Sequence, residues 1–147
     1  MDRESFFQLW SPRVRSILRI MTGLLFMQHG LMKLFAWPPS EMFAQPVELM
    51  SLMGVAGVLE LVGGALITVG LLTRVTAFIL SGQMAVAYFM AHAPQNFFPA
   101  LNQGEAAILY CFVFLYFAFA GAGVWSLDQA FRSGRRNFAD TTAPPPA

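Results

Sequence analysis

The residues of this chain that could do chemistry are the few ionisable side chains inside its apolar segments. Glu60 is the only acid well inside such a segment. His29 and Lys33 lie four residues apart in the preceding apolar segment, so on a helix they share one face. A carboxyl group, an imidazole and an amine can exchange protons or anchor a polar ligand. We therefore take Glu60, His29 and Lys33 as candidate catalytic residues.

The same residues also allow a purely structural interpretation. A charged group at the centre of a membrane helix costs roughly 2.5–3.5 kcal/mol on insertion scales, so such groups usually face a neighbouring helix and find a partner. Glu60 could thus belong to an ion pair that only fixes how two helices pack. Lys33 could instead extend toward lipid headgroups, and this is the expectation for Arg19 at the other end of the same helix.

Three further polar side chains could line a ligand pocket beside these residues. Gln83 lies in the middle of a third apolar segment, Tyr88 follows it, and Tyr110 lies in a fourth. An amide and two phenols can hydrogen-bond a quinone headgroup, whereas a lone glutamine is also a common bridge between helices. The cofactor is therefore left open, with a quinone as the candidate. No metal site is predicted.

Four long apolar segments must position these side chains. A bilayer core about 30 Å thick needs roughly 20 apolar residues per helix. The segments fall at residues 14–36, 50–72, 75–93 and 106–125, and the second connection is reduced to Thr73 and Arg74. The sequence predicts an all-α, integral membrane four-helix bundle over residues 1–131 and a disordered cytoplasmic tail over 132–147. Gly57 and Gly64, on the face of Glu60, are predicted to face another helix closely.

The composition agrees with a chain surrounded by lipid. Hydrophobic residues make up 56% of the 147 residues and charged residues 12%, against about 25% charge in soluble domains. The formal net charge of +1 provides no field for nucleic acid. The one cysteine, Cys111, excludes an internal disulfide or a paired-thiol redox motif. Any redox chemistry must therefore use other groups.

The arginines predict the orientation of the bundle. In a four-span arrangement they all fall on one side, while the first and third connections contain no Lys or Arg. They are Arg3, Arg13, Arg15, Arg19, Arg74, Arg132, Arg135 and Arg136. Because positive residues stay inside, this side and both termini are placed in the cytoplasm. The predicted location is the bacterial cytoplasmic (inner) membrane, with the polar site toward the outer leaflet.

The first two segments carry an ordered pair of motifs. The residues concerned are Arg19 and Gly23, then His29, Gly30 and Lys33, and in the second segment Glu60, Gly63, Gly64, Gly70 and Arg74. Their order and spacing resemble the DoxX family of small bacterial membrane proteins. The resemblance implies a four-helix bundle and a link to membrane redox systems, such as quinone-linked oxidoreductases or systems for thiol and oxidant stress.

Three functions remain open from the sequence. The first is a quinone-associated subunit of a membrane redox system, in which Glu60 and its neighbours handle protons. Since no flavin or nucleotide motif is present, its electrons would come from a partner. The second is a non-catalytic assembly or stabilising subunit, and the third is a small proton-coupled transporter. Whether the chain is an enzyme is undecided. The expected partners are the lipid bilayer and either further copies of the chain or a redox subunit.

Overall fold

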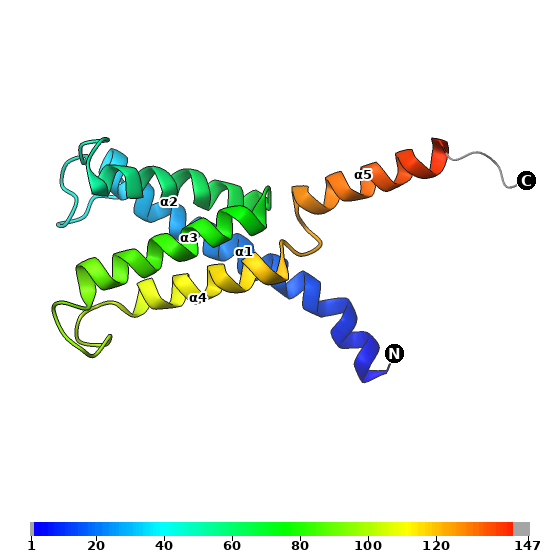
Figure 1. Ribbon diagram of the computed structural model, residues 1–147, viewed down its shortest axis with the longest axis horizontal. Coiled ribbons are helices and arrows are strands. Elements are labelled where there is room, and N and C mark those ends of the chain that lie inside the picture. The colour runs from blue at the N-terminus through cyan, green and yellow to red at the C-terminus, as the bar shows by residue number, and fades with distance from the viewer. Residues whose placement is uncertain (1, 143–147) are drawn as a thin grey trace, which may run out of the picture.

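The chain forms a bundle of helices from which both ends emerge on the same side (Figure 1). The computed structural model describes residues 2–142, and for residues 135–142 the backbone alone. These residues form helices and no strand. The elements are α1 (Arg3–Phe35), α2 (Leu52–Val69), α3 (Thr73–Ala87), the π-helical turn η1 (Tyr88–His92), α4 (Glu105–Ala120) and α5 (Leu127–Thr142). The predicted all-α class is confirmed for the described residues.

The bundle core lies between two helix pairs. Helix α1 packs mainly against α2, and α3 packs mainly against α4, while α2 and α3 join the pairs. Phe26 of α1, Ile67 of α2 and Leu80 of α3 are fully buried between them, together with Phe114 and Phe117 of α4. Helix α4 therefore turns some of its phenylalanines into the core and others outward, since Phe119 is exposed.

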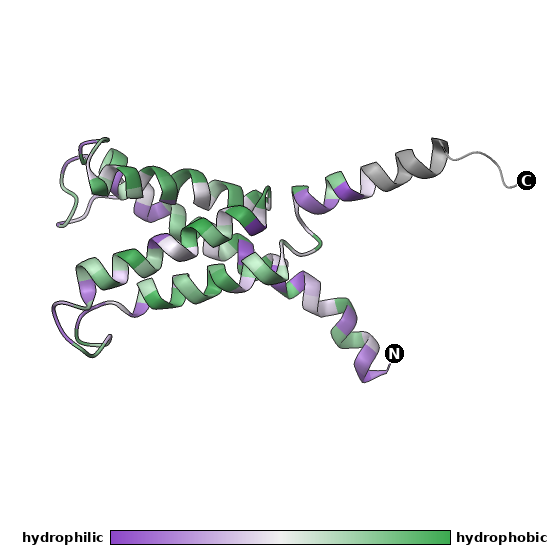
Figure 2. Cartoon of the chain, viewed as in Figure 1, coloured by the Kyte–Doolittle hydropathy of each residue, from purple (hydrophilic) through white to green (hydrophobic). Residues whose placement is uncertain are grey.

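Helix α1 begins earlier than the apolar pattern predicts. The expected helix was 14–36, whereas α1 starts at Arg3. Asp2 provides the reason, because its carboxylate accepts a hydrogen bond of 2.7 Å from the Ser5 amide and so caps the first turn. The added turns project beyond the bundle (Figure 1). Hydropathy alone misses them because they are amphipathic rather than apolar (Figure 2).

The second connection lies at Gly70–Leu72 and not at Thr73 and Arg74, which already belong to α3. Gly70 ends α2 with φ +71°, a conformation that glycine adopts without strain. Asp128, next to the start of α5, accepts hydrogen bonds from the Leu72 and Thr73 amides at 2.8 and 2.9 Å. A residue far along the chain therefore fixes this turn.

The end of the bundle also departs from the predicted fourth segment. The predicted helix 106–125 stops at Ala120, because Gly121 and Gly123 have φ of +76° and +82°. A further helix, α5, then runs to Thr142. Residues 132–142 of the tail that was expected to be disordered are thus helical here, and residues 143–147 lie outside the described residues.

Glycines bring α1 and α2 into close contact, as predicted for Gly57 and Gly64. A Cβ atom on Gly64 would lie 2.6 Å from Met27 Cγ, and one on Gly57 would lie 3.1 Å from Lys33 Cβ. From the other side, a Cβ on Gly30 would lie 2.6 Å from the Leu61 amide nitrogen. Real Cβ atoms do not come as close as 2.6 Å to another heavy atom, and few come as close as 3.1 Å, so these glycines let α1 and α2 approach each other closely.

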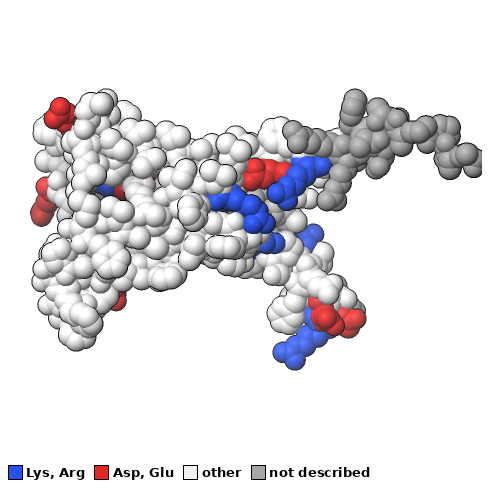
Figure 3. Space-filling model, viewed as in Figure 1, with Lys and Arg blue, Asp and Glu red and all other residues white. Residues whose placement is uncertain are grey.

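Two helical stretches of the described residues are long and apolar enough to cross a membrane. They are Leu52–Val69 and Thr73–His92, while α4 is apolar but shorter. Core helices of soluble proteins can meet the same length and composition criteria, so this is modest evidence. Most residues of the bundle helices are apolar (Figure 2), and many of their large apolar side chains are exposed. Basic side chains gather at the end where the termini emerge (Figure 3).

Candidate functional site

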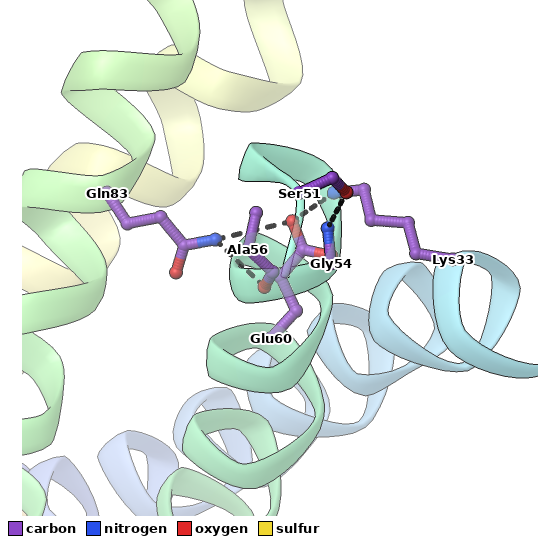
Figure 4. A network of polar contacts seen from close by, with 6 residues as sticks. All are labelled: Lys33, Ser51, Gly54, Ala56, Glu60 and Gln83. Atoms are coloured by element: carbon purple, nitrogen blue, oxygen red, sulfur yellow. Dashed lines mark hydrogen bonds and ion pairs between the residues drawn. The ribbon is translucent and has the colours of Figure 1, made fainter. Parts of the chain in front are cut away.

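Three polar side chains from three helices meet near the end of the bundle away from the termini (Figure 4). Lys33 of α1 donates a hydrogen bond and forms an ion pair with Oε1 of Glu60 on α2. Gln83 of α3 donates its Nε2–H groups to the same oxygen at 3.4 Å and to the Ala56 carbonyl at 3.3 Å. Glu60 is 2% exposed, and the Lys33 side chain is 13% exposed. Lys33 therefore reaches inward and does not extend to the lipid headgroups.

Local structure holds Lys33 and Glu60 in place. Lys33 lies in the last turn of α1, which ends at Ala36 with φ +51°, and its carbonyl accepts a hydrogen bond of 2.9 Å from the Val47 amide. The first connection thus folds back over the end of α1. On the other side, Ser51 caps α2 by accepting a 3.0 Å hydrogen bond from the Gly54 amide. The end of α1 is thus fixed at Lys33 itself, and the start of α2 is fixed nine residues before Glu60.

Two oxygen atoms in this cluster lack a partner among the described residues. They are Oε2 of Glu60 and Oε1 of Gln83, and both are buried. A buried oxygen without a hydrogen bond is costly, so each would gain from a donor. The cluster also contains a donor, Lys33 Nζ, which uses one of its three N–H groups on Glu60. It can therefore accept from and donate to a polar group that enters beside Glu60.

His29 does not join Glu60 through a hydrogen bond among the described residues, although the sequence suggested that they could meet. Its side chain is exposed, and its ring lies edge-on to Tyr110 with the ring centroids 6.0 Å apart. Tyr110 in turn packs on Phe26 and Phe114 at 5.0 and 5.8 Å. His29 and Tyr110 form a second group, which borders the aromatic core.

Tyr88, the first residue of the π-helical turn η1, belongs to a third group. Its ring stacks on His92 with centroids 6.4 Å apart, and His92 Nδ1 lies 2.9 Å from the Asn102 carbonyl oxygen. Asn102 is buried and orders the third connection, because its side chain bonds the Asn96 carbonyl and the Gly104 amide, each at 2.8 Å. The contacts of Tyr88 are thus with this connection and not with Glu60.

The sequence analysis missed the role of Arg19. It is fully buried and donates to the carbonyls of Ile67 and Thr68 in the last turn of α2, and to those of Ala122 and Trp125 beyond α4. The expectation that Arg19 extends to headgroups is therefore wrong, because these carbonyls replace the headgroups as its partners. The sequence offers one related feature, the glycine at position 70. A Cβ atom there would lie 2.9 Å from Arg19 Cζ, so Gly70 leaves room for the guanidinium group.

Comparisons with known proteins give the following matches. The DoxX family model matches residues 14–93. A protein of Haemophilus influenzae (strain ATCC 51907 / DSM 11121 / KW20 / Rd) named "Uncharacterized protein" is 42% identical over 125 residues, which cover 83% of this chain and 93% of that protein. "Putative oxidoreductase CatD" of Bacillus subtilis (strain 168) is 27% identical over 122 residues, which cover 82% and 89% respectively. No solved structure matches.

Proposed function

Since the chain belongs to the DoxX family of membrane proteins, we propose that it is a quinone-associated subunit of a membrane redox system, with the quinone headgroup held beside Glu60. The observation that carries the proposal is the buried cluster of Lys33, Glu60 and Gln83 with its two unpartnered oxygens. The name of the Bacillus subtilis relative, an oxidoreductase, points to the same class of chemistry.

The residues present fit a quinone headgroup. Its two carbonyl oxygens accept hydrogen bonds and take up protons when the ring is reduced. Lys33 Nζ, which has three N–H groups and uses one on Glu60, can donate to a carbonyl, whereas Glu60 Oε2 and Gln83 Oε1 can accept from a hydroxyl. Tyr110, whose ring packs on Phe26 and lies edge-on to His29, would supply an aromatic side to this site.

In this proposal each polar residue has a separate task. Glu60 exchanges a proton with the bound headgroup, since a carboxyl group in a water-poor site can hold or release one. Lys33 orients the Glu60 carboxylate through Oε1 and leaves Oε2 available. Gln83 positions the ligand from α3. His29, exposed beside Tyr110, can carry protons between the site and the surface.

Glu60→Gln tests the proposal. The amide keeps the shape of the side chain but cannot exchange a proton. We expect this variant to insert and to unfold close to the wild-type temperature, because the amide oxygen still accepts from Lys33, whose side chain is 13% exposed. It should retain roughly tenfold less quinone on purification, because hydrogen bonds to a charged group are worth about 1.5–3 kcal/mol. The measurement is extraction and chromatography of quinone from protein purified in mild detergent, with native mass spectrometry of the same samples.

Glu105→Gln is the matched control, because it makes the same chemical change at an exposed residue in the first turn of α4. It should retain as much quinone as the wild type. If the wild-type protein retains no quinone, or if Glu60→Gln retains as much as Glu105→Gln, the proposed site is wrong.

A non-catalytic assembly subunit is the second candidate. The observation that favours it is that Lys33, Glu60 and Gln83 tie α1, α2 and α3 together, which is what a purely structural ion pair would do. Under this alternative Glu60→Gln lowers thermal stability and the yield of any complex with a partner subunit or a second copy. Wild-type stability with lost quinone favours the redox role instead.

We also propose that α1 to α4 cross the bacterial inner membrane with both termini in the cytoplasm. The segregation of the arginines supports this. Helix α4 has 16 residues and is therefore roughly 24 Å long, so local thinning of the bilayer or interfacial flanking residues would match it to the membrane.

In a Cys111→Ala background, cysteines replacing Ser40 and Gln95 should react with a membrane-impermeant maleimide in intact spheroplasts. Ser133→Cys should react only after permeabilisation, and its labelling from outside would refute this topology.

A further inference from the structure

A groove lined by both charged and apolar residues lies at the end of the bundle where the termini emerge, far from the Lys33–Glu60 pair. Its volume is about 530 Å³. It is lined by α1, by the turn that opens α3, by the segment after α4 and by the start of α5. Three arginines, Arg15, Arg74 and Arg132, line it against a single acid, Asp128. In the view of Figure 3, basic side chains gather at this end of the bundle.

The charges in this groove do not cancel one another locally. The two carboxylate oxygens of Asp128 accept hydrogen bonds from the amides of Leu72 and Thr73, so Asp128 caps α3. Arg15 and Arg74 each use one terminal nitrogen to bind carbonyls at the end of α4, those of Ala120 and of Ala118 and Phe119. These bonds fix the guanidinium groups but leave their other N–H groups available.

Two buried donors lining the groove lack a partner among the described residues. One is Arg15 Nε and the other is Thr73 Oγ1. Thr73 is 0% exposed and opens α3, where the helix dipole favours negative charge. An arginine N–H can only donate and a hydroxyl can donate as well as accept, so one acceptor group is able to satisfy both atoms. A group with several anionic oxygens would satisfy both donors and balance the excess of arginines.

We propose that this groove binds a phosphate group. Arg15 and Arg132 supply the charge, and Thr73 supplies a neutral hydrogen bond. The phosphate could be carried by an anionic phospholipid at the membrane surface or be free in solution, and both present the same oxygens. In either case it joins α1, α3 and α5 through one ligand and stabilises the end of the bundle remote from the Glu60 site. This inference does not depend on the proposed quinone.

Thermal unfolding of the full-length protein in nanodiscs tests the proposal. Three conditions are compared: phosphatidylcholine alone, phosphatidylcholine with phosphatidylglycerol, and phosphatidylcholine with inorganic phosphate against an equal ionic strength of chloride. Wild-type protein should unfold at a higher temperature with phosphatidylglycerol or with phosphate, because a ligand that binds only the folded state stabilises it. A shift with phosphatidylglycerol alone identifies the lipid, and a shift with phosphate identifies the free ion.

Thr73→Val and Arg132→Gln should each raise the ligand concentration for half of this shift roughly tenfold. Valine keeps the shape of threonine, and Arg132 is exposed, so at least one variant should fold. Arg13→Gln is the control, because it removes the same charge from α1 but does not line the groove. The proposal is overturned if neither ligand shifts the wild type, if both groove variants respond like the wild type, or if Arg13→Gln loses as much as they do.

Discussion

Lys33→Met is expected to destabilise the bundle by about 3–5 kcal/mol, because it leaves the buried Glu60 carboxylate without its cation. Methionine matches the length and volume of the lysine stem, so packing against Gly57 is kept and the loss reports on the charge. The measurement is the midpoint of thermal or denaturant unfolding in detergent.

The double variant Lys33→Met/Glu60→Gln is expected to be more stable than Lys33→Met alone. Removing the second charge leaves two neutral side chains, and the Gln83 amide can still donate to the carbonyl of the new glutamine. Such a recovery is the sign of a coupled buried pair. If the double variant loses as much unfolding free energy as the two single variants lose together, Lys33 and Glu60 contribute independently. The ion pair then does not hold α1 against α2.

The apolar helices could be predicted from the sequence because lipid or core burial demands continuous apolar residues. The predicted segments 50–72 and 75–93 correspond to α2 (Leu52–Val69) and to α3 with η1 (Thr73–His92). The first turns of α1 and all of α5 could not be found by the same criterion, because amphipathic helices have low mean hydropathy. Their signals were local ones, such as the Asp2 cap and the glycines at 121 and 123.

The site was predicted in part for a similar reason. A buried acid requires a partner, and Lys33 lay within reach on the neighbouring segment, so their pairing followed from energetics. Gln83 was placed in the pocket by its depth, and the structure brings it to Glu60. Depth could not predict the rotation of α1 and α3 about their axes. Helix packing sets that rotation, and it directs His29 to Tyr110 and Tyr88 to the third connection.

The family motifs have two separate structural roles. Lys33 and Glu60 meet near the end away from the termini, whereas Arg19, Gly70 and Arg74 lie at the other. Gly70 leaves room for the Arg19 guanidinium, and Arg74 binds carbonyls at the end of α4. Some of the family motif residues therefore form the candidate site, and the others hold the helices together at the opposite end of the bundle.

Arg19→Met is expected to cost at least about 3 kcal/mol, since the carbonyls of Thr68, Ala122 and Trp125 lose their donor at roughly 1–3 kcal/mol each. The fourth carbonyl, of Ile67, also accepts a hydrogen bond of 3.1 Å from the Gly70 amide and so keeps one partner. Arg19→Lys should fall between the wild type and Arg19→Met, because an ammonium keeps the charge but lacks the planar set of donors.

Arg13→Met separates this effect from a general loss of positive charge. Arg13 lies in the same helix, and its hydrogen bond is to Leu9, one turn earlier in α1, so its removal should change the unfolding midpoint little. If Arg19→Met and Arg13→Met unfold at the same temperature, the four carbonyl bonds contribute nothing net. A large loss confined to Arg19 would instead show that a single guanidinium joins α1, α2 and the segment after α4. In that case the bond from Arg19 to the Trp125 carbonyl also fixes the segment that leads into α5, beside the groove proposed to bind phosphate.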